Sequence, residues 1–209
     1  MMLIDNLRMA ETVCHAIRET PVQHLVYISS DAVYADSENP LNENSCAQPG
    51  SLHGVMHLAR EVMLVNSWQG PLCILRPTLI YGEGDPHNGY GPNRFLRLAK
   101  KKEEIILFGE GEEKRDHVWI HDVSDLTCRV LGQKSTGILN IATGKVTSFR
   151  EIANQVTMII PNSSKIKGSP RTGPMPHNGY RPFDPTATHK AFTNFSYTSL
   201  EEGLRKVHG

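Results

Sequence analysis

The sequence predicts an α/β fold built around a doubly wound, largely parallel sheet. Amphipathic helical segments alternate along the first half with short runs that are almost wholly apolar, HLVYISS at 24–30 and GPLCILRPTLIYG at 70–82. Strands that are covered on both faces are apolar throughout, and their alternation with helices is typical of βαβ units. A chain of 209 residues suits one domain, or one and a half, and can bury a sizeable core.

The N-terminal half is expected to contain two helices and two buried strands. Apolar residues fall at helical spacing over residues 1–19, so the chain opens inside an amphipathic helix. The run at 24–30 follows as a buried parallel strand, and the polar segment 36–50 forms a loop. A helix over about 51–68 then leads to the second buried strand at 70–82.

The second half is expected to contain shorter elements. A loop over 82–93 leads into a helix over 94–102, and residues 105–120 predict two short strands joined by a Gly-rich turn. The remaining expected elements are a helix over 121–132 with His121 or Asp122 near its start, a strand over 138–144, a helix over 148–160 and a C-terminal helix over 198–207.

Two local features accompany these elements. Ser148 followed by Glu151 forms a capping box that predicts where the helix over 148–160 begins. The segment 161–188 is rich in Pro, Gly and Ser, which predicts a long ordered loop or a mobile lid.

One short motif occurs twice. PHNGYGP at 86–92 and PHNGYRP at 176–182 agree at six of seven positions. Two Asn-Gly turns flanked by prolines explain part of this agreement, because turn chemistry favours those residues. The alternative hypothesis is that the two loops touch the same ligand.

Composition excludes several classes of partner. The chain carries 22 Lys and Arg against 22 Asp and Glu, so it has no basic footprint for nucleic acid or an anionic membrane. No apolar run approaches the roughly 18 residues of a membrane span, and the N-terminus lacks a signal-peptide apolar region. Four scattered cysteines without C-x-x-C spacing predict neither a zinc knuckle nor a disulfide framework. We expect a cytoplasmic protein whose partner is a small molecule or another protein.

The segment SLHGVMH places His53 and His57 four residues apart, on one face of a helix and one turn from each other. Two histidines at this spacing can share a zinc ion. A zinc site needs a third ligand, and no spacing in the sequence indicates one. We therefore expect no metal here.

Five segments carry motifs that follow one another in a specific order. They are VYISSDAVYAD, SLHGVMHLARE, ILRPTLIYGEGD, LFGEGEEKRDHVWIHDVSDL and GILNIATG. Together they resemble the extended short-chain dehydrogenase/reductase family, the NAD(P)-dependent nucleotide-sugar epimerases and dehydratases, and the resemblance runs from Asn6 to the C-terminal SLEEGL. It implies a Rossmann-like sheet with a small α/β substrate-binding domain. The implied activity is that of an isomerase or oxidoreductase, which acts on a nucleotide sugar by hydride transfer and proton abstraction.

The resemblance gives the two histidines family positions but not family residues. The family has a tyrosine where this chain has His53 and a lysine where it has His57. That tyrosine takes a proton from a sugar hydroxyl, while the lysine ammonium holds the ribose and lowers the tyrosine pKa. An imidazole can accept a proton, since its ordinary pKa is about 6.5, but a neutral imidazole lacks the lysine's permanent charge. Altered cofactor-site residues and histidines packed in the core stay open as alternatives.

A second departure concerns the cofactor. The family begins with a strand and a Gly-rich turn that holds the cofactor pyrophosphate, and no such turn precedes the first apolar strand here. By the family pattern, roughly three βα units, on the order of 80 residues, are absent. The predicted fold is therefore a partial doubly wound sheet lacking its first βα units. We expect weak or absent binding of NAD or NADP. We also expect an exposed apolar surface through which the chain forms a homo-oligomer.

The family motifs assign roles to individual positions. The implied catalytic residues are Ser30, His53 and His57, and the implied cofactor-binding residues are Ser29, His57, Pro77, Thr78 and Tyr81. The implied substrate-binding residues are Asn93, Arg94, Arg115 and Arg181. A guanidinium such as that of Arg115 can contact a diphosphate bidentately, although a surface ion pair with Asp116 is the alternative.

Four further positions refine this assignment. Asp31 stands where dehydratases keep an acid, but Ala32 replaces the glutamate that follows it, which weakens a dehydratase assignment. His117 and His121 are expected to serve in packing and helix capping.

The resemblance also divides the chain. Residues 1–83 correspond to the C-terminal part of the NAD(P)-binding domain, and residues 84–209 mainly to the substrate domain, with a strand at 137–143 returning to the main sheet. An alternative function is a non-catalytic derivative or incomplete chain that binds a sugar nucleotide or a partner protein without turnover.

Overall fold

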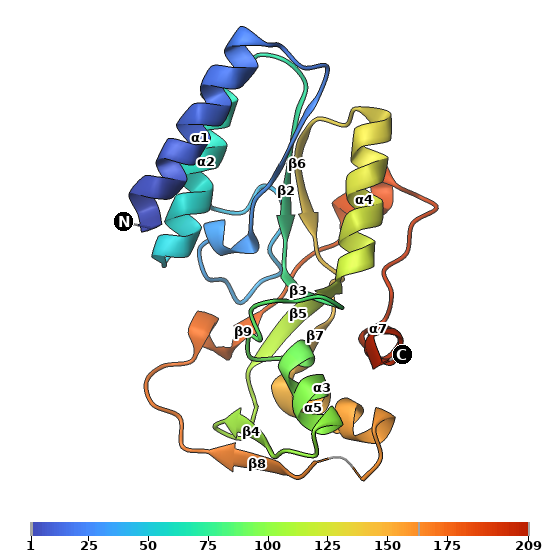
Figure 1. The fold of residues 1–209 in the computed structure, drawn as a ribbon. Coiled ribbons are helices and arrows are strands. Elements are labelled where there is room, and N and C mark those ends of the chain that lie inside the picture. Colours follow the sequence, from blue (N-terminus) through green and yellow to red (C-terminus); the bar gives the residue numbers. More distant parts are fainter. Residues whose placement is uncertain (1, 163, 209) are drawn as a thin grey trace.

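The structure is a computed structural model that describes residues 2–162 and 164–208. Figure 1 shows an elongated molecule with an upper and a lower part. The upper part contains α1 (Met2–Glu19), β1 (Leu25–Ile28), α2 (Leu52–Ser67), β2 (Leu72–Pro77), α4 (Ile120–Gln133), β6 (Gly137–Ile141) and α6 (Thr186–Ala191). The lower part contains β3 (Leu79–Tyr81), α3 (Pro92–Lys100), β4 (Ile105–Phe108), β5 (Lys114–Trp119), β7 (Val146–Ser148), α5 (Phe149–Ile159), β8 (Ile166–Ser169), β9 (Tyr180–Arg181) and α7 (Leu200–His208). Short 3-10 turns form η1 (Asp31–Val33) and η2 (Pro176–Gly179).

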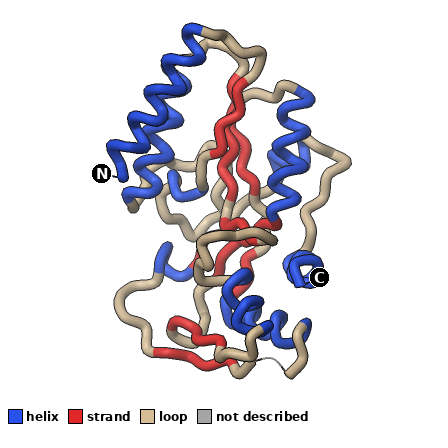
Figure 2. Tube along the Cα trace, in the orientation of Figure 1, coloured by secondary structure: helices blue, strands red, loops and turns tan. Residues whose placement is uncertain are grey.

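The upper sheet confirms the predicted parallel architecture. Its strand order is β1-β2-β6, and both pairings are parallel. Figure 2 shows α1 and α2 on one side of these strands and α4 on the other. The apolar residues of β2 after Leu72 are buried between these layers, and Leu75 has no exposed surface. This double cover explains why β2 is apolar apart from Arg76, whose charge is paired with Glu61.

The first strand is less buried than we predicted. β1 has a hydrogen-bonded neighbour on one side only within the described chain, namely β2. Ile28, at its end, is 43% exposed. The prediction of a fully buried strand was wrong because an apolar run does not reveal whether both edges of a strand are paired.

The run at 70–82 forms two strands, not one. β2 ends at Pro77, and β3 begins at Leu79 and pairs in parallel with β5 of a different sheet. Thr78 lies between them, and its N–H donates to the carbonyl of Ile141 at 3.1 Å. The chain therefore crosses from the upper part to the lower part at a single residue.

The two strands around the Gly-rich turn exist, but they do not pair with each other. β4 pairs in parallel with β8, Ile105 opposite Ile166, whereas β5 lies between β3, β7 and β9. Gly109 and Gly111 both have positive φ, which turns the chain away from β4. The Pro- and Gly-rich segment 161–188 supplies β8, the partner of β4, and β9, one of the partners of β5; residue 163 lies outside the described residues.

The predicted helices are confirmed, with one difference in capping. At α5 the Ser148 hydroxyl accepts from the N–H of Glu151 at 3.1 Å, and the Glu151 carboxylate accepts from the N–H of Ser148 at 2.8 Å. At α4 no side chain caps the first turn. Asp122 lies in that turn but accepts from Thr198 instead, at 2.8 Å from its N–H. This bond joins the helix to the segment before α7.

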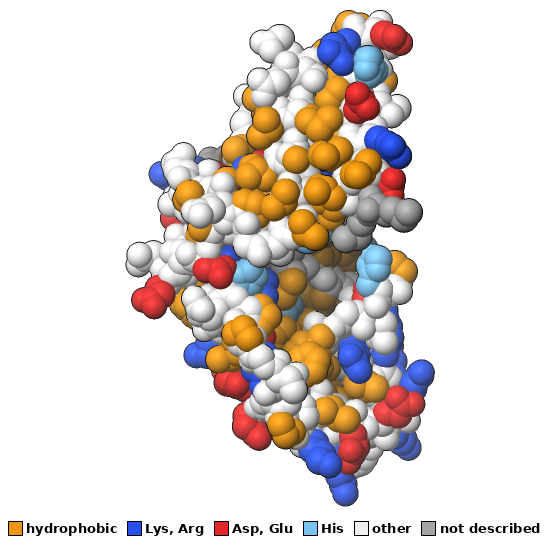
Figure 3. Space-filling model, turned by 90° about the vertical axis from the view of Figure 1, so that its left-hand side faces the viewer, with side chains coloured by type: hydrophobic (Ala, Val, Ile, Leu, Met, Phe, Trp, Pro, Cys, Tyr) orange, Lys and Arg blue, Asp and Glu red, His pale blue; other side chains and the backbone are white. Residues whose placement is uncertain are grey.

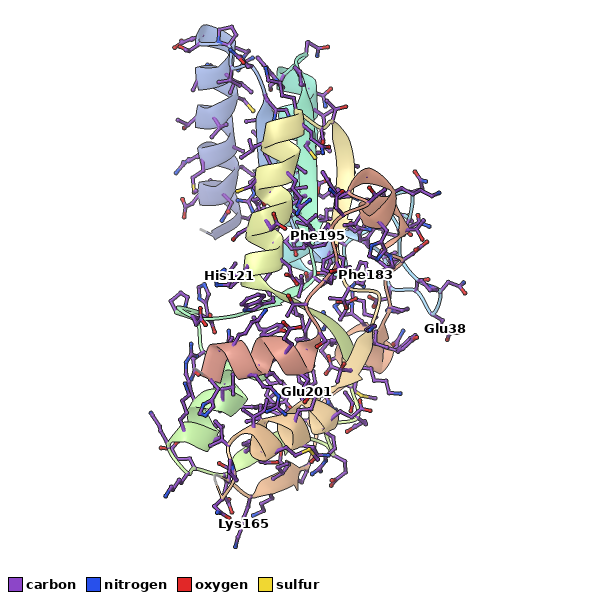
Figure 4. All side chains as sticks on the ribbon, turned by 90° about the vertical axis from the view of Figure 1, so that its right-hand side faces the viewer. Glu38, His121, Lys165, Phe183, Phe195 and Glu201 are labelled. Carbon is purple, nitrogen blue, oxygen red and sulfur yellow. The ribbon has the colours of Figure 1, made fainter. Side chains whose placement is uncertain are left out.

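The segment between α6 and α7 packs against the upper part of the molecule. Phe195, labelled in Figure 4, lies against α4 and packs with Leu126 and Val130. Arg129 lies over its ring at 5.6 Å. The residues after α6 therefore complete the core of the upper part before the chain returns downward to α7.

Exposed apolar side chains gather on α1 and α2. Figure 3 shows them over the upper part of the molecule, above a hollow that separates it from the lower part. We call this surface the α1/α2 apolar face; it consists of Ile4, Met9, Val13, Leu52, Val55, Val62 and Val65.

None of the helices in residues 2–162 and 164–208 is long and apolar enough to cross a membrane.

A buried ion pair joins α2 to the sheet. The Arg76 guanidinium donates through Nε to Oε1 of Glu61 at 3.0 Å and through Nη2 to Oε2 at 2.5 Å. The hydroxyl of Ser29 also donates to Glu61, at 2.5 Å. Arg76 lies over the Tyr34 ring at 4.8 Å. Only 4% of Arg76 and 3% of Glu61 is exposed, so each charge depends on the other for its solvation.

We predict that Arg76→Met lowers the free energy of unfolding by about 3 kcal/mol or more, because it leaves the Glu61 carboxylate buried without its cation. Urea denaturation measures the change. Arg205→Met is the matched control, since Arg205 pairs with Glu201 on the exposed surface of α7 and such pairs contribute about 0.5 kcal/mol. Equal losses in the two variants would contradict the structural role of the buried pair.

Candidate functional site

A cavity of about 690 Å³ opens at the carboxyl ends of β1 and β2, the edge of a parallel sheet where ligands bind in open α/β folds. The start of α2, the η1 turn, β3, β5 and η2 complete its wall. The side chains that line it include Ser29, Ser30, Asp31, Tyr34, Asp36, His53, His57, Pro77, Thr78, Arg115 and His177.

The first strand delivers Ser30 to this cavity. Ser30 is the N-cap of η1, and its hydroxyl oxygen accepts from the N–H of Ala32 at 3.2 Å. The hydroxyl also lies 3.4 Å from the Asp31 carboxylate. Ser29 lines the cavity as well, but its hydroxyl is committed to Glu61. Of the two serines, Ser29 is buried whereas Ser30 is partly exposed, so Ser30 is the more accessible from the cavity.

The close approach of α2 to η1 sets the position of the two histidines. Ser51 caps α2 by accepting from the N–H of Gly54 at 3.2 Å. A Cβ atom at Gly54 would lie 2.1 Å from the carbonyl oxygen of Ala32, so only glycine permits this contact. His53 and His57 then both line the cavity, with their ring centroids 4.7 Å apart and tilted by 71°.

The two imidazoles have different surroundings. His53 is exposed, whereas His57 is partly buried. Burial lowers the pKa of His57 to about 4, and the positive charge of Arg60 and the neighbouring His53 act in the same direction. His57 is therefore a neutral imidazole at pH 7.

Of the three arginines predicted to bind substrate, Arg115 is the one that lines the main cavity. Arg115, on β5, lines it and lies 3.4 Å from a Glu113 carboxylate oxygen and 3.9 Å from the Asp31 carboxylate. Both ion pairs are loose, and neither is bidentate in the sense that fixes a guanidinium. Arg115 is thus placed to contact an anionic group that enters from the open side.

Arg181 does not face the cavity. It is 1% exposed, and its Nε donates to Asp31 at 3.1 Å. Nη1 donates to Asp36 at 3.0 Å and contacts His177, and Nη2 donates to the carbonyls of Asp31 and Tyr34 at 2.7 and 3.3 Å. Each guanidinium nitrogen has a protein partner, so the hydrogen bonds of Arg181 stabilise the η1 turn.

The implied cofactor residues separate into two groups. Pro77 and Thr78 line the cavity at the point where the chain crosses between sheets. Tyr81 is 1% exposed and packs with Phe95 and Leu204 in the core of the lower part. Burial raises the pKa of its phenol. The implied cofactor contact by Tyr81 thus falls on a core residue.

Asn93 and Arg94 lie away from the main cavity. Asn93 lines a neighbouring cavity of about 230 Å³, where it donates to Asp85 at 3.0 Å and accepts from the N–H of Gly82 at 3.1 Å. Arg94 is exposed on α3. The duplicated motifs also separate: segment 86–92 lines this smaller cavity, whereas Pro176 and His177 line the main one. The two cavities share Leu79 and Ile80.

The sequence did not indicate three further residues that shape the site. Arg60 and Glu61 lie beyond the histidine motif on α2, and His177 comes from the second copy of the duplicated motif. The spacing of Arg60 from His57, three residues on a helix, could have indicated the first contact. Nothing local in the sequence connects Glu61 to Arg76 or His177 to Asp36. No group of three or more His, Cys, Asp or Glu side chains is arranged to hold a metal within residues 2–162 and 164–208.

A buried histidine lines the smaller cavity. His117, on β5, is 5% exposed and meets the Phe149 ring edge-on at 5.6 Å. Neither of its ring nitrogens has a hydrogen-bond partner in the part of the chain that the structure describes. Burial lowers its pKa to about 3. Asp116 beside it behaves oppositely, because burial raises the pKa of its carboxyl to about 6.

Comparison with known sequences gives matches along most of the chain. A model of the "NAD dependent epimerase/dehydratase family" matches residues 2–142. A protein of Methanocaldococcus jannaschii named as a putative UDP-glucose 4-epimerase is 30% identical over 199 residues, which cover 91% of this chain and 64% of the relative. A dTDP-D-glucose 4,6-dehydratase of Mus musculus is 24% identical over 76% of this chain and 46% of its own length.

Solved structures agree with the fold. A UDP-glucuronic acid 4-epimerase from Bacillus cereus, solved with UDP-glucuronic acid and NAD, superposes with a TM-score of 0.85 at 20% identity. It is matched over 97% of this chain and 66% of its own. A putative epimerase from Burkholderia cenocepacia gives a TM-score of 0.88 at 19% identity, over 99% of this chain and 69% of that one. The chain thus spans about two thirds of the length of these relatives, or less.

We predict that His117→Phe flattens the pH dependence of stability on the acidic side. The folded-state pKa of about 3 lies below the ordinary 6.5, so the stability that neutral His117 contributes is present above pH 6.5 and is lost as pH falls toward 3. Phenylalanine keeps the contact with Phe149 but does not titrate. Between pH 7 and pH 4 the wild type should lose about 3 kcal/mol more than the variant, at about 1.4 kcal/mol per pKa unit.

Urea denaturation at several pH values measures this difference. Asp116 and His57 are present in both proteins, so their contributions cancel in the comparison. His121→Phe is the control, because His121 lies exposed at the start of α4. Parallel pH profiles for the wild type and His117→Phe would show that His117 is protonated equally in the folded and unfolded states.

Proposed function

This chain belongs to the NAD-dependent epimerase/dehydratase family, and from that premise we propose that it acts on a nucleotide sugar in an NAD(P)-dependent reaction of the epimerase or dehydratase type. The observation that carries the proposal is the convergence of Ser30, His53 and Arg115 on one cavity at the carboxyl ends of parallel strands. The names of the relatives, which include UDP-sugar epimerases and sugar-nucleotide dehydratases, support the same substrate class.

Each side chain has a part in this proposal. The Ser30 hydroxyl binds and orients the reacting sugar hydroxyl, and the His53 imidazole accepts its proton. Arg115 binds the diphosphate, because a guanidinium matches the geometry of phosphate oxygens. Thr78 and Pro77 form the wall against which the reacting ring lies. Arg181 supports the turn that carries Ser30 and makes no contact with substrate.

The residues present suit one end of the cofactor. His57, Pro77 and Thr78 surround enough open space for a nicotinamide and its ribose, where the nicotinamide would accept and return hydride. No Gly-rich turn leads into a helix beside β1 in the described residues, since α1 precedes that strand. We therefore assign no residue to the pyrophosphate, and we propose that this chain by itself binds NAD or NADP weakly.

We also propose that the protein forms a homo-oligomer through the α1/α2 apolar face. Seven aliphatic or thioether side chains are exposed together there. Contiguous apolar surface of this kind marks a protein interaction site on a soluble chain. The zero formal net charge adds no long-range repulsion between copies.

The substrate proposal predicts that Arg115→Ala raises the dissociation constant of UDP-glucose about tenfold, the equivalent of one charge-assisted phosphate contact of about 1.4 kcal/mol. UDP alone should lose affinity by the same factor, because both carry the diphosphate. Calorimetry measures both ligands. Lys114→Ala is the matched control, since Lys114 is an exposed cation one residue away on the opposite face of β5.

An unchanged affinity in Arg115→Ala would remove the diphosphate assignment. Conversion of UDP-glucose in the presence of NAD, followed by NMR, then separates an enzyme from a binding protein. Loss of conversion in His53→Ala with retained UDP-glucose affinity supports the assignment of His53 as the proton acceptor. Binding without conversion in the wild type would instead favour a non-catalytic protein.

The oligomer proposal predicts that Met9→Glu with Val62→Glu converts the protein to a monomer in sedimentation velocity experiments. The charges would have to be buried without partners in the contact between copies. Met158→Glu is the control, because Met158 is an exposed apolar residue that lies on α5 in the lower part. A wild-type protein that is already monomeric would contradict the proposal.

A further inference from the structure

The His57 ring lies between groups from β1 and α2. The Tyr27 hydroxyl lies 3.3 Å from Nδ1, and one guanidinium nitrogen of Arg60 lies 3.3 Å from Nδ1 and 3.4 Å from Nε2. The lone pair and the N–H of a neutral imidazole lie in the ring plane and point in different directions. A nitrogen almost equally distant from both ring nitrogens therefore lies over the face of the ring. Helical spacing permits this, because residues three apart share one side of a helix.

The placement of Arg60 affects the charge of His57. A guanidinium is always protonated, so a second positive charge on the adjacent His57 imidazole is disfavoured. The other groups that face His57 do not offset this effect. Tyr27 presents a neutral phenol, whose pKa is raised by burial, and His53 presents a second imidazole, tilted by 71° to the His57 ring. The nearest carboxylate on α2, that of Glu61, is already paired with Arg76.

We propose that Arg60 is a positioning residue that keeps the His57 imidazole uncharged, so that His53 is the imidazole of the pair that exchanges a proton at the cavity. The inference rests on the proposed function for the role of His53, but the charge of His57 follows from the contacts alone. The position of Arg60 thus gives the two histidines different protonation behaviour. His57 then offers a neutral N–H or ring nitrogen to a bound ribose over the whole physiological pH range.

Arg60 also returns a permanent positive charge to this part of α2. The resemblance placed a lysine at the position of His57, and its charge is lost in this chain. The guanidinium of Arg60 stands behind the imidazole and close to the Tyr27 ring, 5.6 Å from its centre. Its Nε is buried and has no hydrogen-bond partner among the described residues. No carboxylate in residues 2–162 and 164–208 forms an ion pair with it, so its charge is not neutralised locally.

The test is an NMR titration of the histidine ring protons from pH 8 to pH 4, with the His57 signal assigned from the spectrum of His57→Gln. In the wild type this signal should show no midpoint above about pH 5, consistent with burial and the Arg60 charge. Arg60→Gln should raise the midpoint by about one pH unit or more. Arg60→Lys should restore most of the wild-type behaviour, because it keeps the charge.

Arg205→Gln is the matched control, since it removes one exposed cation from α7 and should leave the His57 midpoint unchanged. A wild-type midpoint near 6.5, or an unshifted midpoint in Arg60→Gln, would overturn the inference. The titration needs no substrate, so a failure of the proposed function in the UDP-glucose experiments leaves it intact. Conversely, a failed titration removes the role of Arg60 and leaves the diphosphate assignment of Arg115 standing.

Discussion

The arrangement of the site depends on the buried ion pair between Arg76 and Glu61. Glu61 lies on the same helix as both histidines, so fixing its carboxylate fixes the rotation of α2 about its axis. The same carboxylate accepts from Ser29, which fixes the end of β1 one residue before Ser30. A fully bonded buried pair of this kind specifies one arrangement because any shift leaves a charge without a partner. The relative positions of β1, β2 and α2 at the cavity are thereby fixed.

Local patterns in the sequence predicted the helices and the parallel strands. Periodicity indicated α1 and α2, and a capping box indicated the start of α5, because these signals depend on neighbours within one or two turns. The break at Thr78 and the pairing of β4 with β8 had no local signal. Each depends on a partner strand far away in the sequence, and an apolar run looks the same whether it serves one sheet or two.

The predictions for the site divide in a similar way. Motif positions brought Ser30, the two histidines and Arg115 to a common cavity. Tyr81 and Arg181 do not line this cavity. A motif predicts the position of a residue in the fold, but not the hydrogen-bond partners of its side chain. Arg181 illustrates this point, because its guanidinium is directed entirely at the turn beneath Ser30. The anionic contact in our proposal therefore falls to Arg115 alone.

The bond between Arg181 and Asp31 joins residues that are 150 positions apart in the chain. During synthesis the turn that carries Ser30 emerges long before the arginine that supports it. Closing so long a loop costs conformational entropy, which the contacts that form with it must offset. An early and a late segment of the sequence therefore form the wall of the cavity jointly, and the turn that carries Ser30 depends on a residue 150 positions away.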